Sequence, residues 1–163
     1  GLIDFGVVSE PVDTSDEAIE FIPVSTIQDI FVRSEKYPVA EKKLDPVLLR
    51  KYPLILLEKE TSTRRYIDSF FGEGTLSPSI ELATSDLLIE FARRGIGIPC
   101  VVEDFAKDDL ASGRLCRVEL RHELPPRRFM LAHLKNLPLP AAASHIIREI
   151  LSDLGGESND SEK

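Results

Sequence analysis

Two short clusters of hydroxyl side chains are the residues of this sequence best suited to hold a ligand. Each cluster stands where an apolar run, predicted to be a strand, gives way to a predicted helix. The first N–H groups of a helix have no partner inside the helix, and the helix dipole favours negative charge beside them. Hydroxyls next to such amides suit a carboxylate or another small anion, although each hydroxyl could also serve only as a helix cap. The clusters are Thr61, Ser62 and Thr63, followed by Arg64 and Arg65, and then Thr84 and Ser85.

The pair Gly95 and Gly97 has the spacing of a phosphate-binding loop, but its position argues against that role. A phosphate loop lies between a strand and the helix that follows it, because the phosphate needs the helix N-terminus. Here the glycines follow a predicted helix, Asp86–Arg94, and precede a predicted strand. We therefore predict that Gly95 takes a positive φ at the helix end and that Gly97 permits close packing against the sheet.

The sequence offers little for catalysis or for a metal. Cys100 and Cys116 do not form a CxxC motif, and the three histidines are scattered. Asp86 stands beside Thr84 and Ser85, but no histidine accompanies this polar cluster in the sequence. We expect two reduced thiols, no metal, no cofactor and no enzymatic activity, because a nucleophile needs a positioned base.

Length and charge set the broad class. The 163 residues carry a formal net charge of −8 and are 42% hydrophobic, which is typical of a globular protein. No basic face is evident, so this segment alone is not expected to bind DNA. Neither a membrane-spanning run nor a secretory signal is visible, and we expect a cytoplasmic protein without membrane contact.

The apolar patterns predict an α/β fold with parallel strands in the middle of the chain. The closing helix is expected to begin near Pro140 with an apolar stripe that includes Ala143 and Ile147, and 155–163 is expected to be a disordered tail. Within the helix after Thr84, the predicted buried stripe consists of Leu87, Leu88, Phe91 and Ala92. The predicted strands are Ile3–Ser9, Phe21–Val24, Ile30–Val32, Leu54–Leu57, Ile80–Thr84, Ile96–Val102, Leu115–Leu120 and Arg128–Leu134.

Four stretches, taken in order, resemble the effector-binding domain of LysR-type transcriptional regulators. Between them they cover most of the chain up to Leu154. They are GLIDFGVV at the start, the run from IQDIFVRSEKYPVA to LILLEKETSTRRYIDSFF, the helix and glycine pair IELATSDLLIEFARRGIGIPCV, and RRFMLAHLKNLPLPAAASHIIREIL near the end. The chain departs from the family at Leu139-Pro140, where a serine usually begins the last helix.

The resemblance implies a type II periplasmic-binding-protein-like fold of two α/β lobes joined by crossover strands. Residues 1–32 with 130–154 would form the first lobe, and residues 33–129 would form the second. The crossings are expected near Ile30–Arg33 and Phe129–His133. The family's helix-turn-helix domain and the elements that usually precede GLIDFGVV are missing from the sequence, so we expect a trimmed, incomplete first lobe.

The resemblance also implies a function. The domain would bind a small, anionic effector in the cleft between its lobes and modulate DNA binding by the separate helix-turn-helix domain of a homodimeric or homotetrameric regulator. A stand-alone solute-binding protein of the same fold is the alternative. The expected effector-binding residues are Ser9, which matches a small polar cleft position, and Thr61, Ser62, Thr63, Thr84 and Ser85.

Overall fold

The computed structural model describes residues 3–39 and 43–157 of the chain. The chain folds into two compact units: Gly1–Thr26 with Arg127–Lys163 form unit 1, and Ile27–Pro126 form unit 2. The chain therefore enters unit 2 once and returns to unit 1 once, as a two-lobed α/β protein requires. Over the residues described, no helix is long and apolar enough to cross a membrane.

Unit 2 is built on a five-stranded sheet in the order β5-β4-β6-β3-β7. The strand β4 runs parallel to both of its neighbours, whereas β3 runs antiparallel to β6 and β7. Because β4, β5 and β6 share one direction, their carboxyl ends meet at one edge of the sheet. The strands are β3 (Asp29–Ser34), β4 (Leu54–Leu57), β5 (Ile80–Leu82), β6 (Ile98–Val102) and β7 (Leu115–Arg117).

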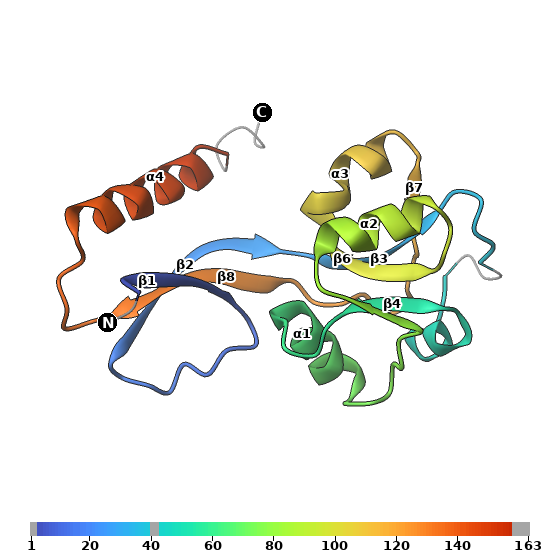
Figure 1. Ribbon diagram of the computed structural model, residues 1–163, viewed down its shortest axis with the longest axis horizontal. Coiled ribbons are helices and arrows are strands. Elements are labelled where there is room, and N and C mark those ends of the chain that lie inside the picture. Colours follow the sequence, from blue (N-terminus) through green and yellow to red (C-terminus); the bar gives the residue numbers. More distant parts are fainter. Residues whose placement is uncertain (1–2, 40–42, 158–163) are drawn as a thin grey trace. The chain divides into compact units, whose positions relative to one another are not determined.

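Two helices cover opposite faces of β4 (Figure 1). Alternate side chains of a strand point to opposite faces, and the two faces of β4 lie in two separate hydrophobic clusters. One cluster contains Ile67 of α1 (Ser62–Phe71), and the other contains Leu88 of α2 (Ser85–Arg93). All of β4 is buried for this reason, which explains why its sequence is uniformly apolar. Unit 2 also contains a 3-10 helix, η1 (Pro46–Lys51), and α3 (Glu103–Ala111).

Both predictions about the glycine pair are confirmed. Gly95 has φ +68° directly after α2, a conformation that residues with a side chain rarely adopt. A Cβ atom at Gly97 would clash with the backbone oxygen of Pro53 and would lie 3.1 Å from Cγ1 of Ile55. Gly97 therefore allows β6 to approach β4 closely.

The hydroxyl pattern predicts Ser62 or Thr63 as the N-cap of α1 and Ser85 as the N-cap of α2, but both N-caps lie earlier in the chain. The N-cap of α1 is Thr61, whose hydroxyl accepts a hydrogen bond from the backbone N–H of Arg64, and not Ser62 or Thr63. The N-cap of α2 is Thr84, not Ser85, and its side chain makes no capping bond. The sequence could not rank adjacent hydroxyl residues, because the choice depends on where the backbone leaves the extended conformation.

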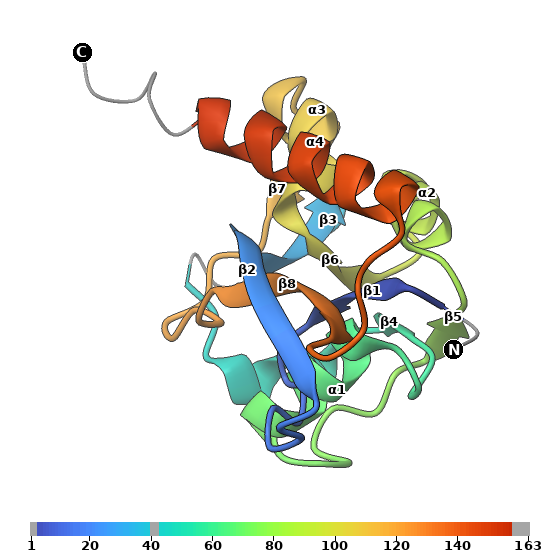
Figure 2. The same cartoon turned by 90° about the vertical axis from the view of Figure 1, so that its left-hand side faces the viewer.

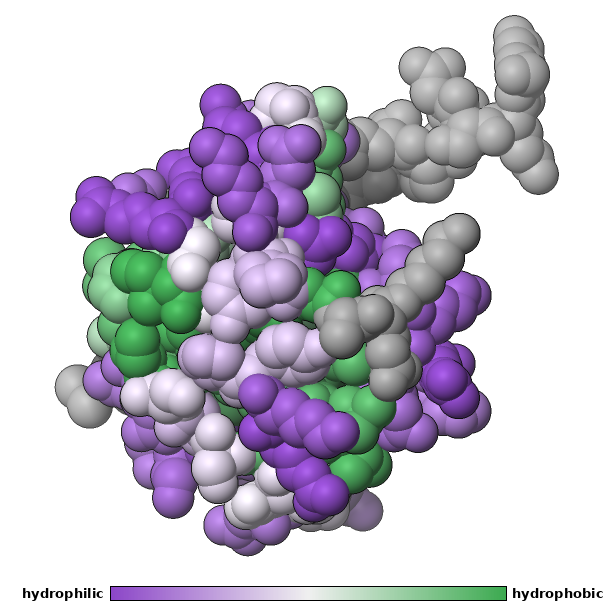
Figure 3. Space-filling view, turned by 90° about the vertical axis from the view of Figure 1, so that its right-hand side faces the viewer, coloured by the Kyte–Doolittle hydropathy of each residue, from purple (hydrophilic) through white to green (hydrophobic). Residues whose placement is uncertain are grey.

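The predicted buried stripe of α2 was wrong at one position. Leu87 is 43% exposed, whereas Ile89 is buried together with Leu88 and Ala92. With the helix beginning at Ser85, residues 88, 89 and 92 share the face that turns toward the sheet. Other apolar side chains of unit 2 are also exposed, and Figure 3 shows hydrophobic residues among hydrophilic ones on one face. Scattered exposure of this kind is normal for a globular protein.

Unit 1 contains a three-stranded sheet in the order β1-β8-β2 and one long helix. The strand β1 pairs antiparallel with β8 along its whole length, from Phe5 opposite His133 to Ser9 opposite Phe129. A loop that begins with a turn then leads from β8 to the helix α4, as Figure 2 shows. The elements are β1 (Phe5–Ser9), β2 (Ile19–Ile27), β8 (Arg127–Leu134) and α4 (Ala141–Glu157).

The crossings between the units fall a few residues earlier in the chain than we expected. The whole of β3 pairs within the sheet of unit 2, so the first crossing lies at residues 26 and 27 rather than near Ile30–Arg33. The whole of β8 belongs to unit 1, so the return lies at residues 126 and 127 rather than near Phe129–His133. The helix α4 extends to Glu157, and the rest of the predicted tail lies outside the described residues.

Candidate ligand site at the edge of the parallel strands

The two hydroxyl clusters lie at neighbouring positions on one edge of the sheet of unit 2. Their strands are adjacent and parallel, with Leu57 opposite Leu82 at the carboxyl ends. Just beyond those ends, the backbone N–H of Glu58 donates a 3.1 Å hydrogen bond to the carbonyl of Leu82. The N-termini of α1 and α2 therefore emerge side by side in the sheet order, which is where open α/β sheets bind their ligands.

In the first turn, the hydroxyl of Thr61 is committed to the fold. It donates to the carbonyl of Glu58 at 2.8 Å and accepts from the N–H of Arg64 at 3.3 Å. Thr63 is buried and also has a partner. Ser62 is half-buried, and its hydroxyl makes no hydrogen bond within the part of the chain that the structure describes. Of this cluster, Ser62 is the residue best placed to offer its hydroxyl to a ligand.

The second turn keeps both of its hydroxyls available. Thr84 is exposed and Ser85 is half-buried, and neither side chain makes a hydrogen bond to any residue of the described ranges 3–39 and 43–157. Asp86 follows in the first turn of α2, where a carboxylate is stabilised by the helix dipole. This turn therefore combines two hydroxyl groups with the amides of a helix start, which have no partner inside the helix.

The sequence allowed Arg64 to offer its positive charge to a ligand. In the structure that charge is instead paired with two carboxylates. Its side chain is only 4% exposed and contacts two carboxylates, with Nε 3.1 Å from Asp68 and Nη1 2.6 Å from Glu81. Burial opposes the charge, but the hydrogen bonds with Glu81 and Asp68 outweigh it and hold the pKa of the guanidinium above its ordinary value. The neighbouring Arg65 is exposed and donates to the carbonyl of Glu60.

A third helix starts at the same edge, where the sequence predicts a short helix and turn over Asp104–Gly113 but no ligand contact. The strand β6 is parallel to β4, and α3 begins directly after it at Glu103. The N–H of Glu103 donates to the carbonyl of Gln28, and Glu103 and Asp104 place two carboxylates in the first turn. The acidic Glu-Asp pair after an apolar strand is the sequence signal for this helix start. These acidic groups already satisfy the dipole of α3, so this turn is a poor site for an anion.

Ser9 belongs to unit 1, whereas the other predicted site residues belong to unit 2. It is buried at the end of β1, and its hydroxyl accepts a hydrogen bond from Nη1 of Arg127. Arg127 is also buried and donates to the carbonyl of Glu10 at 3.2 Å. Within unit 1, the Ser9 hydroxyl therefore has an internal role in holding Arg127.

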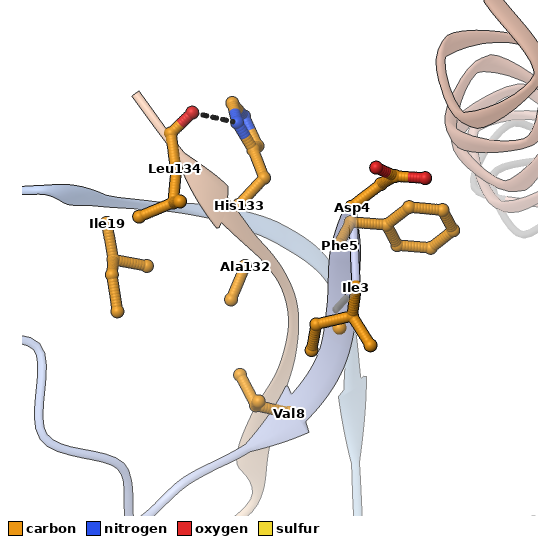
Figure 4. A pocket seen from close by; sticks show the side chains of 9 residues that line it. Ile3, Asp4, Phe5, Val8, Ile19, Ala132, His133 and Leu134 are labelled. Atoms are coloured by element: carbon orange, nitrogen blue, oxygen red, sulfur yellow. Dashed lines mark hydrogen bonds between the residues drawn. The ribbon is translucent and has the colours of Figure 1, made fainter. Parts of the chain in front are cut away.

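Unit 1 carries an apolar hollow of about 340 Å³ on its sheet (Figure 4). Val8, Ile19 and Ala132, from three different strands, line it, and Gly6 contributes a position without a side chain. His133 also borders the hollow and lies 3.5 Å from a carboxylate oxygen of Glu20. This lining suits apolar contact, and none of the predicted site residues borders it.

The described residues contain no group of histidine, cysteine or carboxylate side chains that could hold a metal ion. Cys100 is buried and Cys116 is half-buried, and neither forms a disulfide within the described residues.

Solved structures with the same fold are regulatory domains, although their sequences are distant. The CcmR regulatory domain from Synechocystis PCC6803, in complex with 2-PG, aligns with a TM-score of 0.77 at 18% identity, over 93% of this chain and 73% of that one. The effector-binding domain of QuiR, in complex with shikimate, aligns with a TM-score of 0.74 at 21% identity, over 95% and 73%. The bromide-bound regulatory domain of HypT from Salmonella typhimurium gives 0.75 at 16% identity, over 95% and 74%.

The sequence agrees with this structural likeness. No curated protein matches the chain. The family model of the LysR substrate binding domain, however, matches residues 1–155, which is nearly the whole chain. The predicted type II periplasmic-binding-protein-like fold is thereby confirmed. The chain belongs to the LysR substrate-binding domain family, whose members are regulatory domains of transcription factors.

Proposed function

We propose that this chain is the ligand-sensing part of a LysR-type transcriptional regulator and that it binds a small carboxylate or oxyanion at the shared edge of β4 and β5. The observation that carries the proposal is the pair of adjacent helix starts with uncommitted hydroxyls. Ser62 stands at one start, and Thr84 and Ser85 stand at the other. Hydroxyls and helix amides are all hydrogen-bond donors, which suits an acceptor-rich ligand.

The charges around these turns narrow the ligand class. Arg64 is neutralised by Asp68 and Glu81, while Glu58 and Asp86 are exposed beside the turns. A ligand of high negative charge would meet these carboxylates without a buried cation to balance it. A small acid that also carries hydroxyl groups would satisfy the serine and threonine side chains at lower electrostatic cost.

The molecules bound in the similar structures support an acceptor-rich ligand. CcmR is described in complex with 2-PG, QuiR with shikimate, and HypT with bromide. Because their sequence identities to this chain lie between 16% and 21%, they guide the choice of test compounds and do not identify the effector.

The regulatory step requires a ligand that prefers one conformation of the protein over another. We propose that this preference passes to a DNA-binding domain in the full-length regulator, which works as a homodimer or homotetramer. A coupling of about 1–3 kcal/mol would change DNA affinity roughly 5- to 150-fold. The corresponding measurement is DNA binding by the full-length protein with and without the acid.

A thermal-shift screen of small acids, including shikimate and 2-PG, tests the binding step. A ligand at about 100 times its dissociation constant should stabilise the folded state by roughly 2.7 kcal/mol. The shift should shrink in the Ser62→Ala and Ser85→Ala variants and persist in Ser69→Ala. Ser69 is a matched control because it lies on α1 but bonds the carbonyl of Tyr66, away from the helix start.

Two results would contradict the proposed site. One is a stabilising acid whose effect is the same in Ser62→Ala, Ser85→Ala and the wild-type protein. The other is an effect that depends on Ser69 as strongly as on the two serines of the helix starts. A stabilising compound without an acidic group would instead contradict the proposed ligand class.

A further inference from the structure

Arg64 breaks two local rules at the position it occupies. It is the third residue of α1, and a positive charge in the first turn is disfavoured by the helix dipole. It is also almost fully buried, which costs free energy unless the charge is paired and hydrogen-bonded. A local sequence preference is overridden here by contacts from elsewhere in the fold, and such conflicts concentrate at functional sites.

Those contacts join three elements. Nη1 of Arg64 donates to the carbonyl of Leu57, at the end of β4, at 3.2 Å, and to Oε1 of Glu81, on β5, at 2.6 Å. Nε donates to Asp68, one turn further along α1. The bond to Asp68 stays within one helix, whereas the bonds to Leu57 and Glu81 tie the start of α1 to the ends of two strands.

Glu81 is placed to carry this link into the second turn. It stands three residues before Thr84, and β5 leads directly from it into the start of α2. The hydrogen bond from Glu58 N–H to Leu82 joins the same two strand ends through the backbone. The guanidinium of Arg64 and this backbone bond are therefore two connections between the turns that bear Ser62 and Ser85.

We propose that Arg64 is a positioning residue that, through Glu81 and the carbonyl of Leu57, fixes the two hydroxyl-bearing turns at one spacing. The inference rests on the proposed function, because it assigns the turns to a single ligand site. In this role Arg64 does not touch the ligand. It holds Ser62 and Ser85 so that both can donate to the same small acid.

Amide hydrogen exchange tests the link without any ligand. The Glu58 N–H reports the shared edge of β4 and β5. The Ser79 N–H, which donates to the carbonyl of Leu54 at 2.8 Å, reports the opposite end of the same strand pair. Glu81→Gln removes the carboxylate through which Arg64 contacts β5. Asp68→Asn is the matched control, because it removes the carboxylate that pairs with Arg64 within α1. In Glu81→Gln we expect the Glu58 N–H to exchange about tenfold faster while the Ser79 N–H is unchanged, since local opening need not involve the whole fold.

Three outcomes would overturn the proposal. They are equal acceleration of the Glu58 N–H in Glu81→Gln and Asp68→Asn, no acceleration in either, and equal acceleration of Glu58 and Ser79, which would indicate general destabilisation. Arg64→Lys provides a second variant, because a lysine keeps the charge but lacks the forked guanidinium. It should accelerate the Glu58 N–H as Glu81→Gln does.

Calorimetric titration with shikimate and with 2-PG adds a functional readout. For an acid that the wild-type protein binds, Glu81→Gln should weaken the affinity about tenfold, whereas Asp68→Asn should stay within about threefold of wild type. An unchanged affinity in Glu81→Gln would overturn the positioning role. If the wild-type protein binds neither acid, that result contradicts the proposed function but not the positioning role of Arg64. The hydrogen-exchange experiment then tests the positioning role.

Discussion

The carboxylate of Asp109 lies 2.7 Å from Nη2 of Arg93 and 2.7 Å from Nε of Arg114, so one buried acid joins α2 to α3 and to the turn before β7. The hydrogen bond from Arg93 first, and then that from Arg114, hold the pKa of Asp109 below its ordinary value despite burial. Asp109 is thus a stabilising contact of unit 2 that stands apart from the proposed ligand site.

Asp109→Asn should lower the free energy of unfolding by about 2 kcal/mol at pH 7, because both arginines lose a charged partner. The sign of the pH dependence follows from the lowered pKa. This stability is fully present above the unfolded value of about 4 and is lost as the pH falls through the folded value. Urea unfolding at pH 7 and pH 3 should therefore show a smaller difference between variant and wild type at pH 3. Asp108→Asn, at an exposed neighbour, should change little at either pH, and a constant difference for Asp109→Asn would contradict the assignment.

The two N-cap threonines should respond differently to alanine. Thr61→Ala should cost about 1 kcal/mol of stability, because its hydroxyl caps α1 by accepting from Arg64. Thr84→Ala should change stability by less than about 0.5 kcal/mol, because its side chain makes no capping bond. Thermal unfolding separates the two variants. If Thr84→Ala weakens acid binding while leaving stability intact, the proposed role of this turn gains direct support; equal destabilisation would argue for a purely structural role.

Two glycines should tolerate alanine very differently. Gly97→Ala should cost about 2 kcal/mol, because the new Cβ would meet the backbone oxygen of Pro53 and force β4 and β6 apart. Gly6→Ala should be neutral or slightly stabilising, by about 0.5 kcal/mol, because nothing lies within 4 Å of the added atom. Chemical denaturation of the wild-type protein and both variants measures these changes in the free energy of unfolding. A costly Gly6→Ala would show that the open space beside β1 is filled in solution.

Neighbouring leucines of α2 give a test of the helix orientation. Leu88→Ala should cost about 3 kcal/mol, because its side chain is fully buried in the cluster that contains β4. Leu87→Ala should cost less than about 1 kcal/mol, because Leu87 is 43% exposed. Urea unfolding of the two variants measures the difference, and similar losses would mean that α2 presents another face to the sheet.

Much of the secondary structure followed from residue pattern. The fully apolar run Leu54–Leu57 predicted a strand, and β4 has those bounds and is wholly buried. Gly95 marked the end of α2 because only glycine adopts its positive φ readily. The order of strands and helices predicted parallel pairing, and the resemblance pointed to the family to which the chain belongs. These features depend on neighbours within a few residues, or on motifs that the sequence states directly.

The sequence by itself determined which residues carry hydroxyls and which strands end before them. Only the tertiary structure decided which of those groups remain available. It committed Thr61 to the cap of α1 and Ser9 to Arg127, and it left the hydroxyls of Ser62 and Ser85 without a hydrogen bond to the described part of the chain. Arg64 was likewise visible as a positive charge, but its neutralisation depends on Glu81, seventeen residues away, which reaches it only because β5 pairs with β4. Hydrogen-bond partners are set by strand register and helix placement, and a sequence pattern does not encode those distances.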